Sequence, residues 1–219
     1  MSVTFEPGLL RAYFVAGSQD VPGQDLREVL ATMLRAGITA FQFRDKGAST
    51  LTPDQRLALG RDLREQCRAA SVPFIVDDDV DLALALQADG IHVGQSDEQI
   101  TKVLQTVDGR QMFVGLSCNT AAEVAQANQI KGISYIGSGP IYPTTSKDDA
   151  DPVMGVAGLQ ALVAQANVPV VAIGGVTVAS LPAIAATGAA GVAVITLLTR
   201  SDHPQADTQA MRAAFTATK

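Results

Sequence analysis

The sequence contains no tryptophan, two cysteines and two histidines among 219 residues, and aromatic residues make up 5% of it. Cys67 and Cys118 show no metal-ligand spacing, and two thiols in a chain of this length do not form a disulfide framework. We interpret both as reduced apolar side chains inside the protein. His92 and His203 are interpreted as structural, because neither joins a Ser/His/Asp or Cys/His set at the predicted strand ends. Acyl transfer therefore has no support.

Basic runs and long apolar runs are also missing. The 22 acidic and 16 basic residues give a net charge of -6, and the basic residues are scattered along the chain. This distribution argues against nucleic acid as a partner. No stretch approaches the roughly 18 uninterrupted apolar residues of a membrane span, and residues 1–11 lack the layout of a signal peptide. We expect a cytoplasmic protein with no membrane partner.

Short β-rich apolar runs alternate with longer segments of helical period along the whole chain. With 47% apolar and 17% charged residues, the composition is that of one globular domain with a substantial core. The alternation predicts a parallel sheet with crossover helices. The eight runs are Tyr13–Val15, Ala40–Phe43, Phe74–Val76, Gly90–Val93, Met112–Leu116, Ser134–Ile136, Val168–Ile173 and Gly191–Ile195.

Helix-start signals separate these runs. Thr52 followed by Pro53 and Gln55 predicts a capped helix over the periodic stretch 57–67, and Thr120 with Glu123 predicts another over 121–127. Eight units of about 27 residues fit a lean (β/α)8 TIM barrel. We expect a single barrel domain over residues 1–219, with its core at about 12–217. An open doubly wound sheet shares the local pattern, but residues 17–20 lack the glycine fingerprint of a dinucleotide site, which favours the barrel.

Barrel enzymes carry their reactive groups at the C-terminal ends of the strands, and polar residues gather at those positions here. After the second run, alternation turns Gln42, Arg44 and Lys46 to one face and Phe41 and Phe43 to the other. Two cations and an amide facing the barrel mouth favour a functional role. The alternative is that the two cations are solvated or paired with an acidic neighbour.

Carboxylates follow the third and fourth runs. Asp77, Asp78, Asp79 and Asp81 follow the third run, and Asp97 follows the fourth. Neighbouring strands would bring these groups together, and a few oxygen ligands suit Mg²⁺ when substrate phosphates complete its shell. We predict that Asp78 and Asp97 bind Mg²⁺, whereas Asp79 and Asp81 are candidates for capping the helix that starts near residue 82.

The later strands end in neutral hydrogen-bond donors. Ser117 and Asn119 follow the fifth run, and a loop rich in glycine and hydroxyl groups, 137–147, follows the sixth. The seventh and eighth runs end in 174–175 and 195–196, where barrels often hold a phosphate. The sequence therefore predicts two anion sites, one cationic and metal-linked around strands two to five, the other neutral around strands six to eight.

Together these motifs resemble the thiamine phosphate synthase family. They are 42–46 (QFRDK), Asp78 with 80–83 (VDLA), 88–97 (ADGIHVGQSD), 139–144 (GPIYPT) with Lys147, and 174–175 (GG). The resemblance runs from about residue 13 to 196. It implies a (β/α)8 barrel that joins hydroxymethylpyrimidine diphosphate to hydroxyethylthiazole phosphate, forming thiamine phosphate and releasing diphosphate. The resemblance further implies that the diphosphate leaves first and that the thiazole nitrogen attacks the resulting pyrimidinylmethyl cation.

The resemblance also implies a role for each matching residue. Mg²⁺ would be held by Asp78 and Asp97. The catalytic residues would be Arg44, Lys46, Ser117 and Lys147. The pyrimidine diphosphate would be bound by these four together with Gln42, Phe43, Asp45 and Asp77, with Gln42 orienting the ring. The thiazole phosphate would be bound by Thr144, Thr145, Ser146, Gly175, Ile195 and Thr196. The partners are small phosphorylated molecules, and the oligomeric state is open, a homo-oligomer included.

The chain departs from the family pattern at two positions of consequence. Asp77 stands where the family usually has Asn, and a carboxylate there repels diphosphate unless it is protonated, turned away or facing the metal. Asn119 stands where the family often has His, and an amide is not an acid at neutral pH. Ser146 and Thr196 keep the hydroxyl groups of Thr and Ser and are mild changes.

Three alternatives remain open. A thiazole tautomerase relative shares the barrel but typically lacks the metal and diphosphate residues and uses a histidine where this chain has Asn119. A Schiff-base aldolase would use Lys46 or Lys147, although both lysines neighbour polar groups and not an apolar pocket. A non-catalytic protein that binds thiamine precursors would bind the substrates without turnover.

Overall fold

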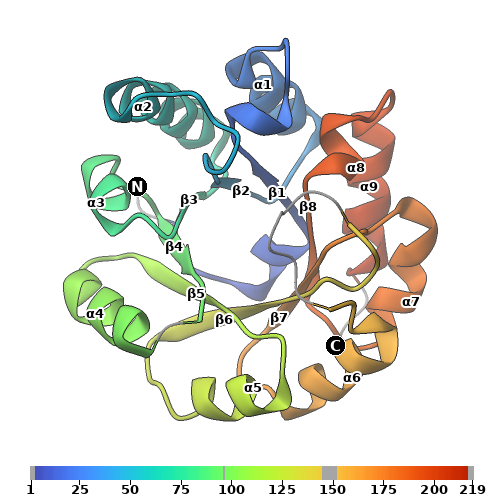
Figure 1. The fold of residues 1–219 in the computed structure, drawn as a ribbon. Coiled ribbons are helices and arrows are strands. Elements are labelled where there is room, and N and C mark those ends of the chain that lie inside the picture. The colour runs from blue at the N-terminus through green and yellow to red at the C-terminus, as the bar shows by residue number, and fades with distance from the viewer. Residues whose placement is uncertain (1–2, 96, 145–151, 217–219) are drawn as a thin grey trace.

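The computed structural model describes residues 3–95, 97–144 and 152–216, whose path is shown in Figure 1. Eight parallel strands close into a barrel, in which each strand pairs with the next along the chain and the last pairs with the first. This confirms the predicted (β/α)8 barrel. The strands are β1 (Ala12–Ala16), β2 (Ala40–Phe43), β3 (Phe74–Asp77), β4 (Gly90–Val93), β5 (Phe113–Ser117), β6 (Ile133–Ser138), β7 (Val170–Ile173) and β8 (Gly191–Val194).

The helices form a ring outside the strands (Figure 1). Within the described residues they are α1 (Leu26–Ala36), α2 (Pro53–Ala70), α3 (Val80–Ala85), α4 (Asp97–Val107), α5 (Ala121–Ala127), α6 (Gly155–Gln165), α7 (Leu181–Ala185), α8 (Thr196–Thr199) and α9 (Pro204–Ala214). Short 3-10 turns lie at Pro7–Leu10, Ser18–Asp20 and Val178–Ser180. In this part of the chain no helix is both long and apolar enough to span a membrane.

The predicted capping residues begin the helices as expected. The Thr52 hydroxyl accepts a hydrogen bond from the backbone of Gln55, and the side chain of Gln55 accepts one from the backbone of Thr52. Thr120 and Glu123 form the same reciprocal pair at the start of α5. Each pair satisfies two backbone donors that the first helical turn leaves without an intrahelical partner.

One strand begins later than its apolar run suggests. The run from Val168 predicted a strand there, but β7 starts at Val170. Pro169 has no backbone N–H and contributes only its carbonyl, which accepts from Ile136 of β6 at 2.9 Å. The ladder therefore starts with one bond at the proline, and regular pairing begins one residue later.

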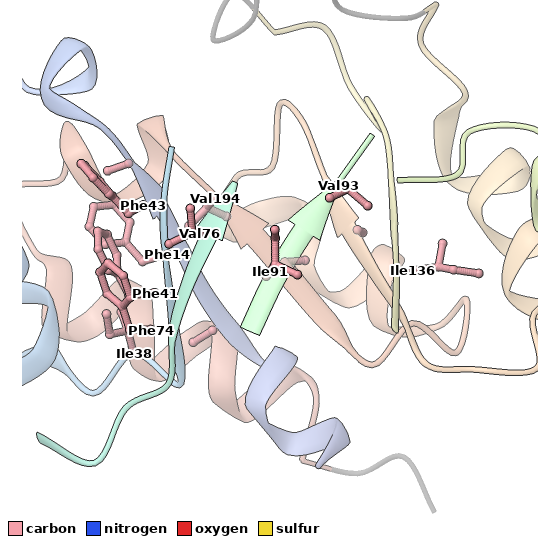
Figure 2. Packing of buried hydrophobic residues seen from close by; sticks show 14 of the residues in the cluster. Phe14, Ile38, Phe41, Phe43, Phe74, Val76, Ile91, Val93, Ile136 and Val194 are labelled. Atoms are coloured by element: carbon pink, nitrogen blue, oxygen red, sulfur yellow. The ribbon is translucent and has the colours of Figure 1, made fainter. Parts of the chain in front are cut away.

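The strands divide the apolar residues between two cores. Side chains that point away from the barrel axis pack against the helices, and Figure 2 shows Phe14, Phe41, Phe43 and Phe74 grouped in this outer core. Successive ring centroids of Phe14, Phe41 and Phe74 lie 5.6 and 5.9 Å apart, within the range of favourable aromatic contacts. As the alternation along β2 predicted, Phe41 and Phe43 face outward, which leaves Gln42 on the inner side.

The second core fills the barrel interior at the N-terminal ends of the strands. Phe5 packs on Phe113, the first residue of β5, with a centroid distance of 5.4 Å, and stacks on Tyr135 at 5.8 Å. Leu10 lies so close to Gly191, the first residue of β8, that an added Cβ there would meet its carbonyl oxygen at 1.8 Å. The segment before β1 therefore covers this end of the barrel, and the polar residues lie at the other end.

Candidate active site

A cavity of about 420 Å³ opens at the C-terminal ends of the strands. This is the end at which (β/α)8 barrels carry their reactive groups. Most of the residues that the sequence assigned to the site line this one cavity, so the two predicted anion sites belong to a continuous space. These residues are Gln42, Arg44, Lys46, Asp77, Asp78, Ser117, Thr144, Gly175, Ile195 and Thr196.

Cations and carboxylates meet at the ends of β2 and β3. The Lys46 ammonium lies 2.7 Å from Asp77 Oδ2 and is also ion-paired with Asp78, while Arg44 Nε lies 3.6 Å from the same oxygen of Asp77. Burial on its own would lower the pKa of Lys46, but the two carboxylates raise it above its ordinary value. Asp77, where the family usually has Asn, thus faces the two cations.

The carboxylate of Asp78 is held in place by its backbone as well as by its partners. Asp78 has a φ of 55°, in the left-handed region that non-glycine residues seldom adopt. One carboxylate oxygen accepts from the backbone N–H of Gly94 at 3.0 Å, and the other is paired with Lys46. Burial favours the neutral acid, but the pairing with Lys46 outweighs it and lowers the pKa of Asp78. Asp78 is therefore an ionised oxygen donor at the cavity wall.

The next residue acts in helix capping, as the sequence indicated. The carboxylate of Asp79 accepts a hydrogen bond from the backbone N–H of Leu82 at 2.9 Å and is ion-paired with Arg56 of α2. Its role is to begin α3 and to join α3 to α2. The cap also fixes the turn in which Asp78 takes its strained conformation.

A polar chain crosses the barrel interior beneath the cavity. Gln42 donates to the hydroxyl of Tyr13 at 2.9 Å, and that hydroxyl lies 2.9 Å from the hydroxyl of Tyr135. His92 continues the chain, with Nδ1 at 3.1 Å from Tyr135 and Nε2 at 3.0 Å from Ser117 Oγ. Burial raises the pKa of both tyrosines, so their hydroxyls keep their protons.

Tyr13 and His92 line the cavity, and the sequence analysis missed both as site residues. His92 was assigned a structural role. Its position on β4 between Ile91 and Val93, which belong to the outer core, was the available signal, because alternation turns the residue between them inward. Gln95 and Glu123 also line the cavity and were missed. No comparable pattern marked them, since both follow their strands in irregular or helical segments.

Among the described residues, those that form the other wall of the cavity, at the ends of β6, β7 and β8, are neutral. Gly174 and Gly175 have φ values of 94° and 66°, and an added Cβ at Gly175 would meet the carbonyl oxygens of Tyr142 and Pro143 at 2.6 Å. Only glycine lets the two loops approach so closely. The bond between Gly139 and Pro140 is cis.

Asn119 is a structural link between two loops of this wall. Its side-chain oxygen accepts from the backbone N–H of Gly139 at 3.0 Å, and the backbone N–H of Asn119 donates to the carboxylate of Glu123 at 2.5 Å. Asn119 also lines the cavity.

Two predicted substrate residues do not line the cavity. Phe43 is 2% exposed and packs in the outer core against Phe74. Asp45 accepts from the backbone and hydroxyl of Ser18 and from the hydroxyl of Ser49, so its carboxylate ties the loop after β1 to the loop after β2. Their contacts indicate that both residues support the shape of the mouth.

Four predicted residues cannot be placed. Thr145, Ser146 and Lys147 lie outside the described residues, and so does the side chain of Asp97, whose backbone begins α4 directly after the β4 loop. Within the described residues there is no cluster of three or more His, Cys, Asp or Glu side chains that could hold a metal ion. Cys67 and Cys118 are buried and free, as predicted.

The closed barrel and its charged cavity at the C-terminal strand ends define the class of molecule, a (β/α)8 barrel with a polar cavity at the end where barrel enzymes carry their reactive groups. The family model described as thiamine monophosphate synthase matches residues 12–198. The chain therefore belongs to the thiamine monophosphate synthase family.

Individual relatives agree over nearly the full length. The chain is 79% identical over 215 residues to the thiamine-phosphate synthase of Levilactobacillus brevis, covering 98% of this chain and 99% of the relative. It is 67% identical over 214 residues to that of Lactiplantibacillus plantarum, covering 98% of each. Among solved structures, the thiamine phosphate pyrophosphorylase from Pyrococcus furiosus superposes with a TM-score of 0.80 at 31% identity, covering 95% of this chain and 96% of that one.

Proposed function

We propose that this chain is a thiamine-phosphate synthase, a transferase that joins hydroxymethylpyrimidine diphosphate to hydroxyethylthiazole phosphate and releases diphosphate. The observation that carries this proposal is the placement of Arg44 and Lys46 beside Asp77 and Asp78 in a cavity whose other wall, as far as the described residues form it, is lined by neutral side chains. A cationic wall suits the departing diphosphate, and backbone donors suit a phosphate monoester. Family membership and the near-full-length relatives support the same reaction.

The pyrimidine is assigned to the inner end of the cationic wall. Gln42 donates its amide N–H to Tyr13, so its amide oxygen is the group that can accept from the amino group of the ring. Arg44 and Lys46, just after the end of β2, line the same cavity, and we assign them to the diphosphate. Ser117 and Lys147 complete this assignment, and the thiazole phosphate is assigned to Thr144, Thr145, Ser146, Gly175, Ile195 and Thr196.

The donors present fit Mg²⁺. Asp78 presents an ionised carboxylate at the cavity wall, and a small number of oxygen donors beside a diphosphate is the environment that Mg²⁺ prefers. Asp78 and Asp97 would hold the ion, which when bound stabilises the charge on the departing diphosphate. Lys46 would then exchange part of its pairing with Asp78 for the substrate.

This chain's residues contribute mainly by positioning and by electrostatic stabilisation. Arg44 and Lys46 stabilise the negative charge that grows on the diphosphate as its bond to the pyrimidinylmethyl carbon breaks. Apolar side chains at and just after the ends of β7 and β8, Ile173 and Ile195 among them, line the cavity and reduce the access of water to the carbocation. The thiazole nitrogen then forms the new C–N bond, which completes the transfer.

The structure disfavours the aldolase alternative at Lys46. A Schiff-base lysine needs a lowered pKa so that its amine is neutral, whereas the carboxylates raise the pKa of Lys46. We include a cytoplasmic location in the proposal, and two buried thiols without a disulfide are what a reducing compartment favours.

The decisive experiment supplies the purified protein with both phosphorylated substrates. We expect stoichiometric release of diphosphate and thiamine phosphate, detected by enzymatic assay and mass spectrometry, with Mg²⁺ present and not with a chelator. Folded protein that binds both substrates without forming product would overturn the proposal in favour of a non-catalytic binding protein.

A further inference from the structure

A continuous set of hydrogen bonds joins two residues of the cavity wall through the interior of the barrel. It runs from Gln42 through Tyr13, Tyr135 and His92 to Ser117, with heavy-atom distances of 2.9, 2.9, 3.1 and 3.0 Å. Each member comes from a different strand, namely β2, β1, β6, β4 and β5. The chain therefore links the proposed pyrimidine site to a proposed diphosphate ligand.

Two glycines make room for this chain. An added Cβ at Gly115 would lie 2.2 Å from Tyr135 Cζ and 2.5 Å from His92 Nδ1, and one at Gly137 would lie 2.9 Å from His92 Cε1. All three distances are shorter than side chains tolerate, so the two rings occupy space that any other residue would fill. The barrel interior is shaped around the contact between His92 and Tyr135.

The amide of Gln42 sets the direction in which hydrogen bonds are donated along the polar chain. A tyrosine hydroxyl carries one proton, and Tyr13 accepts the N–H of Gln42. Either hydroxyl could donate between Tyr13 and Tyr135, but among the described contacts of Tyr13 the hydroxyl of Tyr135 is the acceptor left for its own proton. Tyr135 then directs its proton to Nδ1 of His92. Both tyrosines stay protonated because burial raises the pKa of each. In this direction Nδ1 of His92 is an acceptor, and its remaining proton lies on Nε2, facing Ser117.

We propose that His92 is a positioning residue. The polar chain of hydrogen bonds fixes it as the Nε2–H tautomer, so that the hydroxyl of Ser117 donates its proton into the cavity. Ser117 Oγ accepts from His92, which leaves its O–H for a phosphate oxygen of the substrate. The identity of the substrate rests on the proposed function, but the tautomer does not. In the opposite direction His92 carries its proton on Nδ1, and Ser117 donates to the ring.

The tautomer can be measured directly by nitrogen-15 NMR of the imidazole ring. The protein has two histidines, so the variant His203→Gln leaves the ring of His92 as the single source of the imidazole signal. His203 lies before α9, away from the cavity lining. We expect Nε2 to show the shift of a protonated nitrogen and Nδ1 that of an unprotonated one at neutral pH. The reverse assignment would overturn the proposal.

Removal of the hydroxyl of Tyr135 tests whether the polar chain of hydrogen bonds fixes the tautomer of His92. In the His203→Gln background, Tyr135→Phe keeps the ring but removes the group that donates to Nδ1, so we expect a mixture of both tautomers. If this variant does not fold, Tyr13→Phe breaks the chain one link earlier and is expected to weaken the same preference. An unchanged tautomer in a folded variant of either kind would contradict the proposal.

Kinetics test the effect on Ser117. His92→Leu removes the donor to Ser117, and we expect kcat to fall about tenfold or more with little change in the KM of either substrate, because the interaction strengthens as diphosphate leaves. His92→Gln keeps an N–H near the position of Nε2 and should restore most of the rate. Loss in both variants alike, or a change in KM alone, would overturn the positioning role. Absence of product from the parent protein would instead refute the proposed function and leave the tautomer result intact.

Discussion

Lys46 and Asp77 form a close ion pair across neighbouring strands, with Nζ of the lysine 2.7 Å from a carboxylate oxygen. The side chain of Asp77 is 10% exposed and also faces Arg44. The two cations assigned to diphosphate are therefore partly neutralised by the protein before substrate binds. Diphosphate has to compete with a carboxylate that is fixed in place.

Asp77→Asn removes that competitor while keeping the shape of the side chain. We expect the KM for the pyrimidine diphosphate to fall about tenfold, which corresponds to about 1.4 kcal/mol. Steady-state kinetics with the second substrate saturating provide the measurement. Asp62→Asn changes the net charge equally at an exposed site on α2 and should leave KM unchanged. An unchanged or higher KM in Asp77→Asn would show that Asp77 serves binding.

Gly115→Ala should destabilise the barrel, because the added methyl group overlaps the rings of Tyr135 and His92. We expect a loss of about 1–3 kcal/mol in the free energy of unfolding, measured in urea. Gly94→Ala is the matched control, since nothing lies within 4 Å of a Cβ at that position. Equal stability of the two variants would mean that the rings of Tyr135 and His92 can shift to accommodate the added methyl group.

Chelation of Mg²⁺ and the substitution Asp78→Asn should affect one substrate site and spare the other. We expect turnover to fall on the order of 100-fold or more in either case, because charge on the departing diphosphate loses a stabilising partner. Calorimetry should show an unchanged affinity for thiazole phosphate. Asp81→Asn, an exposed position in α3, is the control. Equal loss of affinity for both substrates would contradict two separate sites.

The free energy of unfolding should decrease at alkaline pH. Burial raises the pKa of Cys118 to about 12 and raises the pKa values of Cys67, Tyr13 and Tyr135 as well. In the unfolded chain thiols ionise near pH 8.5 and tyrosines near pH 10, so the unfolded state loses protons first. The stabilisation from these neutral groups is complete below about pH 8.5 and is lost as the pH rises toward their folded pKa values.

Urea titrations between pH 7 and pH 11 measure this loss. Cys118→Ala removes one of the groups and should reduce the slope of stability against pH between about 8.5 and 10. A slope identical to that of the parent protein would show that this thiol does not ionise preferentially in the unfolded state.

Thr52→Ala should remove the capping box of α2 at the cost of about 1 kcal/mol in the free energy of unfolding. Thr106→Ala is a suitable control, because the hydroxyl of Thr106 bonds within its own helix to the carbonyl of Lys102. Thr52 is exposed and Thr106 is half-buried, so a similar cost for the two variants would argue against a specific capping effect.

The barrel could be predicted because each unit carries its own local signals. Apolar runs, capping boxes such as that of Thr52, and the alternation around Gln42 each act over a few residues and agree with one another. Residues that line the cavity could be predicted where their pattern is visible in one segment, as for Arg44 and Lys46. Phe43 shows the limit of that logic, since a residue inside a motif can face the opposite core.

The polar chain could not be predicted because its contacts join residues far apart in sequence. Tyr13 and Tyr135 are separated by 122 positions, and their hydroxyls meet only when the barrel closes. Gly115 and Gly137 gave no signal either, because a glycine in a strand does not tell which ring occupies the space it leaves. Strand alternation could have placed His92 on the inner face, although it was interpreted as structural, and a role for it follows only from its partners.

Phe5 and Leu10 close the barrel at the end opposite the cavity, so traffic to the described part of the site passes one opening. Gln42 is buried in the barrel interior, whereas Lys46 and Thr144, which line the same cavity, are partly exposed. A second ligand bound nearer the opening of the cavity would block the exit of a ligand bound beside Gln42. Dissociation of the pyrimidine should consequently be slowest when the thiazole phosphate is bound. The order in which the two ligands dissociate then follows from the closed N-terminal end of the barrel.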